Sequence, residues 1–331
     1  MPSSPTAVSD TDATSCEALL ALNRWLCAAG YRFTTITPTS HARVLGRGYH
    51  AARDLRDVFG WNRSFGPELL GEEAMAWLRR GELLQPGNGG DPAQSALMRS
   101  RVRFSTLGPL LFAHSAYPTE AADAVFFGPD TYRFAALIEA ELSRHALPRG
   151  GRILDVGCGS GAGGIVAARH PGAAGASLVL TDINPAALLH ASANAEAAGL
   201  RGVQCLQGDL FAPASGAFDL IVANPPYLVD RAARAYRHGG GALGSALSER
   251  IVAEGVLRLA PGGRLVLYTG APVVAGRDLF HAAALRLLTP GGWPVDYREV
   301  DPDVFGEELS EPAYAEAERI AAVALIVQRP A

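Results

Sequence analysis

The sequence contains no lysine, because all 29 of its basic residues are arginine. Alanine, glycine, arginine and proline are used heavily throughout, which is typical of a GC-rich genome, so the arginine bias alone does not indicate phosphate recognition. Cysteine is also scarce: the four residues show neither metal-ligand spacing nor the density of a disulfide framework. We therefore expect free thiols in a reducing cytoplasm and no bound metal.

Long hydrophobic runs are missing as well. The apolar stretch at residues 18–29 is interrupted by Asn23 and Arg24 and is too short to span a bilayer, so no membrane partner is expected. The net charge of −4 lacks the basic excess that favours nucleic-acid binding, although a local basic patch is compatible with it. With 48% hydrophobic and 19% charged residues, the composition is that of a globular enzyme and excludes a disordered or fibrous chain.

The first part of the chain predicts a small domain. Residues 1–15 are small, polar and acidic, which predicts a disordered tail. Residues 16–120 show helical patterns over roughly 16–29, 41–59 and 67–80, followed by two strand-like runs. This is an α+β arrangement similar to a winged helix, to which we assign substrate recognition. Arg99, Arg101 and Arg103 alternate there and are expected to face one side, either to meet phosphates or to protect an edge strand.

Residues 121–331 alternate strands and helices, as in a parallel sheet covered on both faces. Seven strands are predicted, at residues 152–157, 177–182, 203–206, 218–223, 264–269, 295–300 and 321–328. The acidic, turn-like segment 303–319, with at most a short helix near 313–319, joins the last two without the usual crossover helix. The predicted fold class is α/β: a Rossmann-like, seven-stranded, mostly parallel sheet with an antiparallel last strand.

A glycine-rich turn follows the first of these strands. Asp155 precedes Gly157, Gly159 and Gly161, whose lack of a side chain lets the backbone approach a ligand. Such a turn serves several nucleotide-like ligands and is weak evidence by itself. Asp155 narrows the choice of ligand, because a carboxylate suits the ammonium group of S-adenosylmethionine (SAM) and is unfavourable beside a pyrophosphate. We therefore expect SAM as the cofactor.

Two further acids follow the next two strands. Asp182, with Ile183 beside it, is placed to bind the ribose hydroxyls, although its spacing fits equally well an N-cap for the helix that starts at Pro185. Asp209 could accept the adenine amino group while Leu210 packs on the ring, but a Gly-Asp pair alone also reads as a turn. Together the acids favour an adenosyl ligand across the carboxyl edge of the sheet.

The fourth strand ends in Asn224-Pro225-Pro226-Tyr227, which we regard as the catalytic signature. A planar amine or amide nitrogen is a poor nucleophile because its lone pair is delocalised. The Asn224 side-chain oxygen and the Pro225 carbonyl can hold its two N–H groups, the prolines stiffen the loop, and the Tyr227 ring can stack on the flat group. The alternative interpretation is a rigid turn that closes a strand.

With these motifs, residues 128–331 resemble class I SAM-dependent methyltransferases that carry an Asn-Pro-Pro-Tyr motif, above all release-factor glutamine methyltransferases and small-domain ribosomal RNA guanine methyltransferases. The resemblance implies SAM contacts at the residues matched above: Asp155, Gly157, Gly159, Asp182, Asp209 and Asn224. It also implies substrate contacts, which we assign to Pro226, Asp130, Thr131 and His238. Asp130 fits a helix cap equally well, and His238 with its glycines fits a mobile loop.

The resemblance has three departures, one of which is that the first half lacks the five-helix pattern expected of a bacterial release-factor enzyme. Gly128 stands where the family usually has an arginine, and Tyr132 replaces an acid. The expected function is N-methylation of a protein glutamine amide, with a release-factor-like partner. The alternative is methylation of an exocyclic amine of adenine or guanine in RNA or DNA, and a SAM-binding module without activity is a third candidate.

Overall fold

The structure is a computed structural model that describes residues 10–48, 51–87, 97–230 and 236–331. The chain divides into two compact units. The N-terminal unit comprises Met1–Glu120, Val125–Pro129 and Leu189–Gly199, and the sheet unit comprises Ala121–Ala124, Asp130–Leu188 and Leu200–Ala331. None of the helices in the described ranges is long and apolar enough to cross a membrane.

The N-terminal unit is α+β, as predicted. Four helices precede two antiparallel strand pairs: α1 (Asp10–Ala28), α2 (Pro38–Leu45), α3 (Leu55–Phe59), α4 (Gly71–Arg80), β1 (Leu84–Pro86) with β2 (Met98–Ser100), and β3 (Val102–Leu107) with β4 (Leu110–Ser115). Its core consists of fully buried side chains such as Leu22, Leu26, Phe59, Phe65 and Phe104. The resemblance to a winged helix stays a prediction.

Two details of this unit differ from the sequence prediction. Residues 10–15 of the predicted tail belong to α1, and residues 1–9 lie outside the described residues. The helix expected over residues 41–59 is two short helices. Gly46 ends α2, and Asp54 starts α3 by accepting a hydrogen bond from the Asp57 N–H at 2.9 Å.

The prediction that Arg99, Arg101 and Arg103 form a stripe of arginines on one side is also wrong. Arg99 and Arg103 are only 7% and 4% exposed, whereas Arg101 is exposed. The reason is that Arg101 lies between β2 and β3, so the three residues do not share one continuous strand. Arg99 donates to the Asn62 and Tyr117 carbonyl oxygens at 3.1 and 2.7 Å, which satisfies its guanidinium inside the unit.

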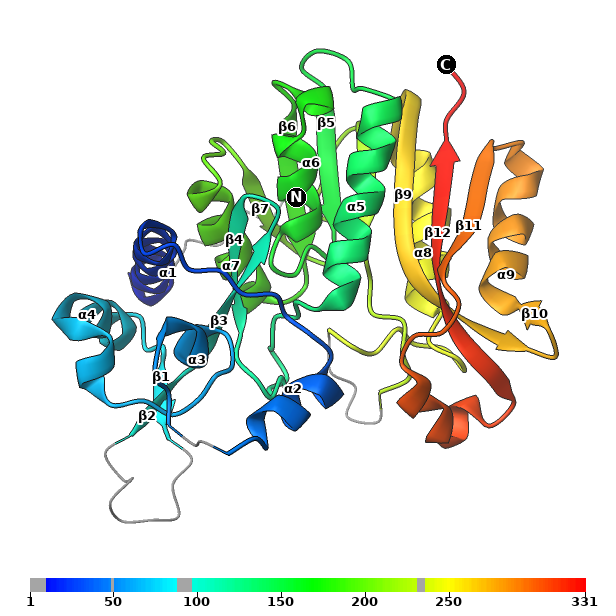
Figure 1. Cartoon of the computed structure of the whole chain (residues 1–331). Helices are drawn as coiled ribbons and strands as arrows, with labels where there is room; N and C mark the ends of the chain where they lie inside the picture. Colours follow the sequence, from blue (N-terminus) through cyan, green and yellow to red (C-terminus); the bar gives the residue numbers. More distant parts are fainter. Residues whose placement is uncertain (1–9, 49–50, 88–96, 231–235) are drawn as a thin grey trace. The chain divides into compact units, whose positions relative to one another are not determined.

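The sheet unit contains one large sheet with the strand order β11-β12-β9-β8-β5-β6-β7 (Figure 1). Its strands are β5 (Arg152–Val156), β6 (Ser177–Asp182), β7 (Gln204–Gln207), β8 (Phe218–Ala223), β9 (Leu259–Val274), β11 (Val295–Asp301) and β12 (Ala317–Gln328). Neighbouring strands from β7 to β9 are parallel, and β12 is antiparallel to both β9 and β11. The predicted mostly parallel sheet with an antiparallel last strand is therefore confirmed.

An eighth strand was missed. The short β10 (Arg277–Asp278) pairs with the end of β9 through a tight turn in which Ala275 and Gly276 both have positive φ. Two residues are too few to give an alternating pattern, so the sequence did not indicate it. The segment 303–319 also differs: instead of a helix near 313–319 it contains the 3-10 helices η6 (Gly306–Ser310) and η7 (Pro312–Tyr314), and β12 begins at Ala317.

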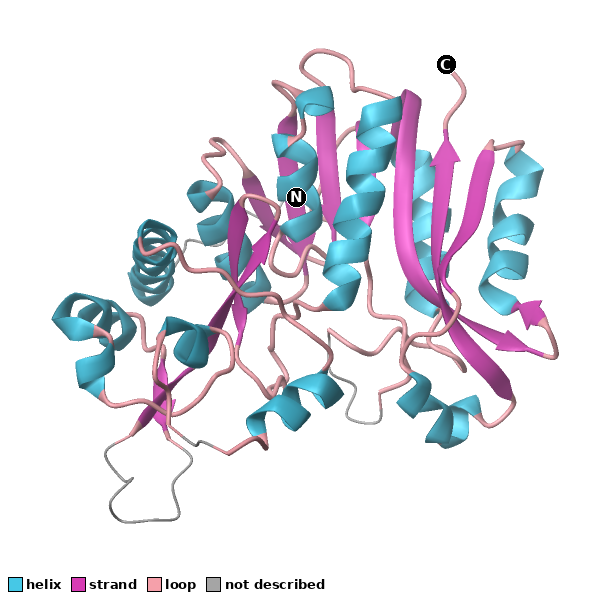
Figure 2. Cartoon of the chain, in the orientation of Figure 1, coloured by secondary structure: helices cyan, strands magenta, loops and turns pink. Residues whose placement is uncertain are grey.

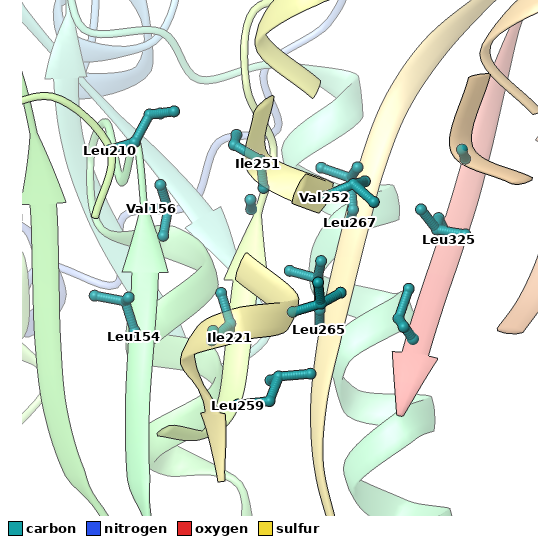
Figure 3. Packing of buried hydrophobic residues seen from close by; sticks show 14 of the residues in the cluster. Leu154, Val156, Leu210, Ile221, Ile251, Val252, Leu259, Leu265, Leu267 and Leu325 are labelled. Atoms are coloured by element: carbon teal, nitrogen blue, oxygen red, sulfur yellow. The ribbon is translucent and has the colours of Figure 1, made fainter. Parts of the chain in front are cut away.

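Helices cover both faces of the sheet (Figure 2). They are α5 (Pro129–Arg144), α6 (Ala162–Arg169), α8 (Ala246–Gly255) and α9 (Leu279–Leu288), while α7 (Pro185–Ala197) begins in this unit and belongs to the N-terminal unit from Leu189 onward. Beneath them the strands carry near-continuous apolar runs, as strands covered on both faces must. Leu154, Ile221, Leu265 and Leu325 are fully buried in this core (Figure 3), and each such side chain contributes about 1.5–3 kcal/mol by leaving water.

Candidate active site

The register of three central strands brings the predicted motifs to one edge of the sheet. Val156 at the end of β5 pairs with Thr181 of β6 on one side and with Ala223 of β8 on the other. The residues that follow these three are Gly157, Asp182 and Asn224. The glycine turn, the second acid and the Asn-Pro-Pro-Tyr loop therefore leave the sheet side by side, although they lie far apart in sequence.

The glycine turn has the backbone that its sequence predicts. Gly157, Gly159 and Gly161 have φ values of +65°, +53° and +78°, which other residues rarely adopt. Gly161 is the N-cap residue of α6, so the turn leads directly into a helix N-terminus. An ideal Cβ at Gly157 or Gly159 would meet no described atom within 4 Å, so the backbone is open to a ligand on that side.

Asp155 lies underneath this turn. Its side chain is buried, and its Oδ2 accepts a hydrogen bond from the Gly164 N–H at 2.7 Å, which holds α6 against the strand end. Burial raises the pKa of the carboxyl group to about 7; the Gly164 N–H works in the opposite direction, and the nearby Asp182 adds to the rise. The structure thus shows Asp155 supporting the turn from inside, and its contact with the SAM ammonium stays a prediction.

Asp182 connects the glycine turn to the next loop. Its Oδ2 accepts from the Gly159 N–H and its Oδ1 from the Asn184 N–H, both at 2.9 Å, and burial raises the pKa of the carboxyl group against these N–H groups. Asn184 rather than Asp182 accepts the hydrogen bond from the Ala186 N–H at the start of α7, at 3.0 Å. The alternative interpretation of Asp182 as a helix cap is therefore wrong, because Asn184 is the residue that caps α7. Beside it, Ile183 is 61% exposed, an unusual place for a large apolar side chain.

The third acid has a partner that the sequence did not indicate. Asp209 is exposed and forms an ion pair with Arg250 of α8 at 2.9 Å, and Arg250 also contacts Glu254 at 3.1 Å. Leu210 has a φ of +46°, which is rare for this residue type, and its side chain is only 8% exposed in the core drawn in Figure 3. The side chain of Leu210 packs in the core, and its expected contact with the adenine ring stays a prediction.

The Asn-Pro-Pro-Tyr loop follows β8 directly. Asn224 is half-buried, and no described residue forms a hydrogen bond with its side chain. Tyr227, by contrast, is only 6% exposed: its hydroxyl donates to Asp130 Oδ2 at 2.6 Å, and a Cβ at Gly270 of β9 would overlap its ring. The expected stacking of Tyr227 on a substrate therefore disagrees with this placement, since the ring packs against the sheet.

Asp130 accepts hydrogen bonds from donors in three separate parts of the chain. It accepts from Tyr227, from the Tyr268 hydroxyl of β9 at 2.8 Å and from Arg133 of α5 at 3.2 Å, and Arg133 pairs in turn with Asp301 of β11 at 2.7 Å. The sequence brought Asp130 and Thr131 near the active site through the resemblance, but it gave no signal for Tyr268 or Asp301. Asp130 is 3% exposed and Thr131 is also buried, so the direct substrate contacts that we expected of them do not fit this placement.

The glycine stretch after the loop packs on the loop's backbone. The Gly239 N–H donates to the Leu228 carbonyl at 2.8 Å, and the Asp230 N–H donates to His238 Nδ1 at 3.2 Å. A Cβ at Gly239 would overlap the Gly244 carbonyl oxygen and would lie 2.7 Å from both the Pro226 oxygen and Tyr227 Cα. Residues 231–235 lie outside the described residues, and a substrate contact of His238 stays a prediction.

The connection between β11 and β12 holds the same loop from another side. The Val229 N–H donates to the Tyr314 hydroxyl at 2.9 Å, and Arg237 forms an ion pair with Glu308. The Phe305 ring meets the Tyr227 ring edge-on at 5.9 Å between centroids, and Phe305 has a φ of +56°, an outlier for a bulky residue. The sequence indicated only acidic turns here, because these contacts join residues some 80 positions apart.

Comparison with known proteins identifies the catalytic half. The profile of the family described as "Methyltransferase small domain" matches residues 135–279. This part of the chain is a methyltransferase domain. The match confirms the class I SAM-dependent methyltransferase family to which the motifs pointed, and it covers the glycine turn, the acids and the Asn-Pro-Pro-Tyr loop.

Two kinds of curated relative share this methyltransferase domain. A release factor glutamine methyltransferase of Deinococcus radiodurans is 36% identical over 203 residues, which is 57% of this chain and 66% of that protein. A second protein of this name, from Bordetella pertussis, is 36% identical over 50% of this chain and 63% of its own length. A ribosomal RNA small subunit methyltransferase C of Chromohalobacter salexigens is 36% identical over 124 residues, 38% of this chain and 33% of that protein. The chain thus spans between a third and just under two thirds of the length of these relatives.

Proposed function

We propose that the protein is a SAM-dependent N-methyltransferase whose acceptor is a planar nitrogen, a glutamine side-chain amide of a release-factor-like protein. The observation that carries the proposal is the position of Asn224. The residue follows β8 beside the glycine turn, and no described residue occupies its side-chain amide. A polar group placed next to a nucleotide-type turn, with no hydrogen-bond partner among the described residues, is suited to hold the acceptor.

The residues around the turn fit SAM. The open backbone at Gly157 and Gly159 can approach the amino-acid portion, and the Asp182 carboxylate at the end of β6 would accept hydrogen bonds from the ribose hydroxyls. The exposed apolar side chain of Ile183 suits a face of the adenine ring, and Asp209 suits its amino group if that group displaces Arg250. When bound, SAM supplies a methyl group that is electrophilic because it is attached to a sulfonium.

The acceptor nitrogen would be held by Asn224 Oδ1 and the Pro225 carbonyl. Two acceptors on the two N–H groups favour a pyramidal nitrogen, whose lone pair is then available for in-line attack on the methyl group. The consecutive prolines fix φ, so these acceptors are preorganised. No strong base is needed, because the nitrogen becomes acidic as it gains the methyl group and can lose its proton to water.

Two observations favour the glutamine amide over a nucleobase amine. The release-factor relatives align with 50–57% of the chain, whereas the ribosomal RNA methyltransferase from Chromohalobacter aligns with 38%. In addition, Arg99 and Arg103 are buried, so the arginine stripe that could have met phosphates is not at the surface of the N-terminal unit. A cytoplasmic location, with no membrane or metal partner, completes the proposal.

The test offers methyl-labelled SAM and the protein to purified release factors and to ribosomal RNA in parallel. We expect label in a release factor, and digestion followed by mass spectrometry should place it on a glutamine side chain. Label in RNA alone would replace glutamine with a nucleobase amine. A protein that binds SAM but labels neither acceptor would support the third candidate, a binding module without activity.

A further inference from the structure

The buried carboxylate of Asp130 is the centre of a network that the proposed reaction does not use directly. Its Oδ2 accepts the Tyr227 hydroxyl at 2.6 Å, and its Oδ1 accepts the Tyr268 hydroxyl at 2.8 Å and Arg133 at 3.2 Å. Both carboxylate oxygens therefore have protein donors, in a side chain that is 3% exposed. A group so enclosed is poorly placed to contact a substrate.

What Asp130 does contact is the catalytic loop. Tyr227 is the last residue of the Asn-Pro-Pro-Tyr run, and the two prolines between Asn224 and Tyr227 leave the loop little conformational freedom. Fixing the Tyr227 side chain therefore fixes the Pro225 carbonyl and the Asn224 amide as well. The ring has no alternative position nearby, because Gly270 lies against one part of it and Phe305 meets it edge-on.

The two tyrosines remain donors at any pH at which the enzyme would work. Burial, together with the negative charge of Asp130, raises the pKa of Tyr227 well above its ordinary value of 10, and it also raises the pKa of Tyr268. Arg133, bridging to Asp301, supplies the positive charge that a buried carboxylate needs. Both oxygens of the Asp130 carboxylate are thus satisfied in hydrogen bonds by described residues.

We infer that Asp130 is a positioning residue of the methyl-transfer site, which acts through the Tyr227 hydroxyl to hold Asn224 and Pro225 at the acceptor nitrogen, with Tyr268 orienting the carboxylate. The inference rests on the proposed function, and it replaces the substrate contact expected of Asp130. It separates the roles within the loop: Asn224 and Pro225 touch the substrate, and Tyr227 anchors them.

The test compares the variants Tyr227→Phe and Asp130→Asn with a Tyr227→Phe/Asp130→Asn double variant. We expect each single variant to lose about tenfold in kcat, because a misplacement of well under 1 Å separates productive from unproductive geometry. The double variant should lose no more than either single one, since both remove the same link. The KM for SAM should stay within about twofold, because the glycine turn is untouched.

Tyr297→Phe is the matched control. The Tyr297 hydroxyl of β11 also bonds to a carboxylate, that of Asp278, at 2.5 Å, but this pair lies at the start of α9 and away from the catalytic loop. Tyr297→Phe and Tyr227→Phe should lower the unfolding temperature by similar amounts, and only Tyr227→Phe should lower kcat. Loss of a stabilising hydrogen bond alone would therefore leave the rate unchanged.

Three results would overturn the inference: Tyr227→Phe with a kcat within twofold of the wild type, multiplicative losses in the double variant, or an Asp130→Asn protein that raises only the KM for the acceptor. The last would restore a substrate contact. All rates are taken relative to the wild type on whichever acceptor the wild type methylates, so RNA as the acceptor would refute the glutamine assignment and leave this test intact. A wild type without transfer to any acceptor would refute the proposed function and, with it, the inference.

Discussion

Replacing Gly239 with alanine is expected to displace the catalytic loop. The added Cβ would overlap the Gly244 carbonyl oxygen and would lie 2.7 Å from both the Pro226 oxygen and Tyr227 Cα. All three neighbours are backbone atoms, so none can rotate away as a side chain could. Gly239 itself has no positive φ, so the substitution tests the close approach of two backbone segments and not an unusual conformation.

The size of the effect follows from these distances. An ordinary Cβ contact lies beyond 3.4 Å, so the Pro226 and Tyr227 backbone must retreat by 0.7 Å or more, and the overlap with Gly244 demands still more. A shift of about 1 Å at a positioning group can cost roughly 100-fold in rate, and overpacking of this kind costs about 1–3 kcal/mol of stability. We therefore expect kcat to fall by about two orders of magnitude in a protein that still folds.

Steady-state methyl transfer and SAM titration of Gly239→Ala measure this directly. Gly46→Ala at the end of α2 is the control, because its Cβ would meet only ordinary contacts, from 3.6 Å, and its φ of −68° suits alanine. SAM affinity should remain within about threefold in both proteins. A Gly239→Ala protein that turns over at more than a third of the wild-type rate would refute the claim that the close approach of Gly239 to Pro226 and Tyr227 positions the catalytic loop.

Two further predictions concern the acids beside the cofactor site. Asp155 has a folded pKa of about 7 against an ordinary 3.8, so the native state holds this proton more tightly than the unfolded chain, and stability should fall by roughly 4 kcal/mol as pH rises from 4 to 8. Asp155→Asn, which cannot ionise, should flatten this dependence in urea unfolding at pH 5 and 8, and an unchanged slope would contradict the burial argument. Asp182→Ala should weaken SAM binding by at least tenfold in calorimetry; unchanged affinity would exclude Asp182 from the ribose site.

The existence of the central strands and the edge of the sheet that carries the site follow from local features of the sequence. Apolar runs of four to six residues predict strands, and the polar residue after each run, such as Asp182 or Asn224, marks its carboxyl end. Parallel strands place those ends together whatever the loops between them do. The sequence could therefore predict the glycine turn, Asp182 and Asn224 as neighbours before any coordinates were known.

Features that depend on tertiary contacts could not be predicted in this way. The tyrosine that completes the Asp130 network, Tyr268, reads in the sequence as one more core residue of β9, and only the sheet register brings its hydroxyl to α5. The position of Tyr227 after two prolines indicated a ring that stacks on the substrate. The ring packs instead in the space beside Gly270 of the neighbouring strand β9, where the glycine has no side chain. The prediction of an arginine stripe was wrong for a similar reason. The alternation of arginines with other residues does not show that β2 ends before Arg101 and β3 begins after it.

The measurement that tests the account most directly is methyl transfer by Asn224→Ala beside its SAM affinity. The account predicts that transfer to the acceptor falls below about one thousandth of the wild-type rate, because the side-chain oxygen that holds the nitrogen is gone. SAM should still bind with a dissociation constant within about threefold of the wild type. Substantial turnover by Asn224→Ala would contradict the central claim that this side chain holds the methyl acceptor.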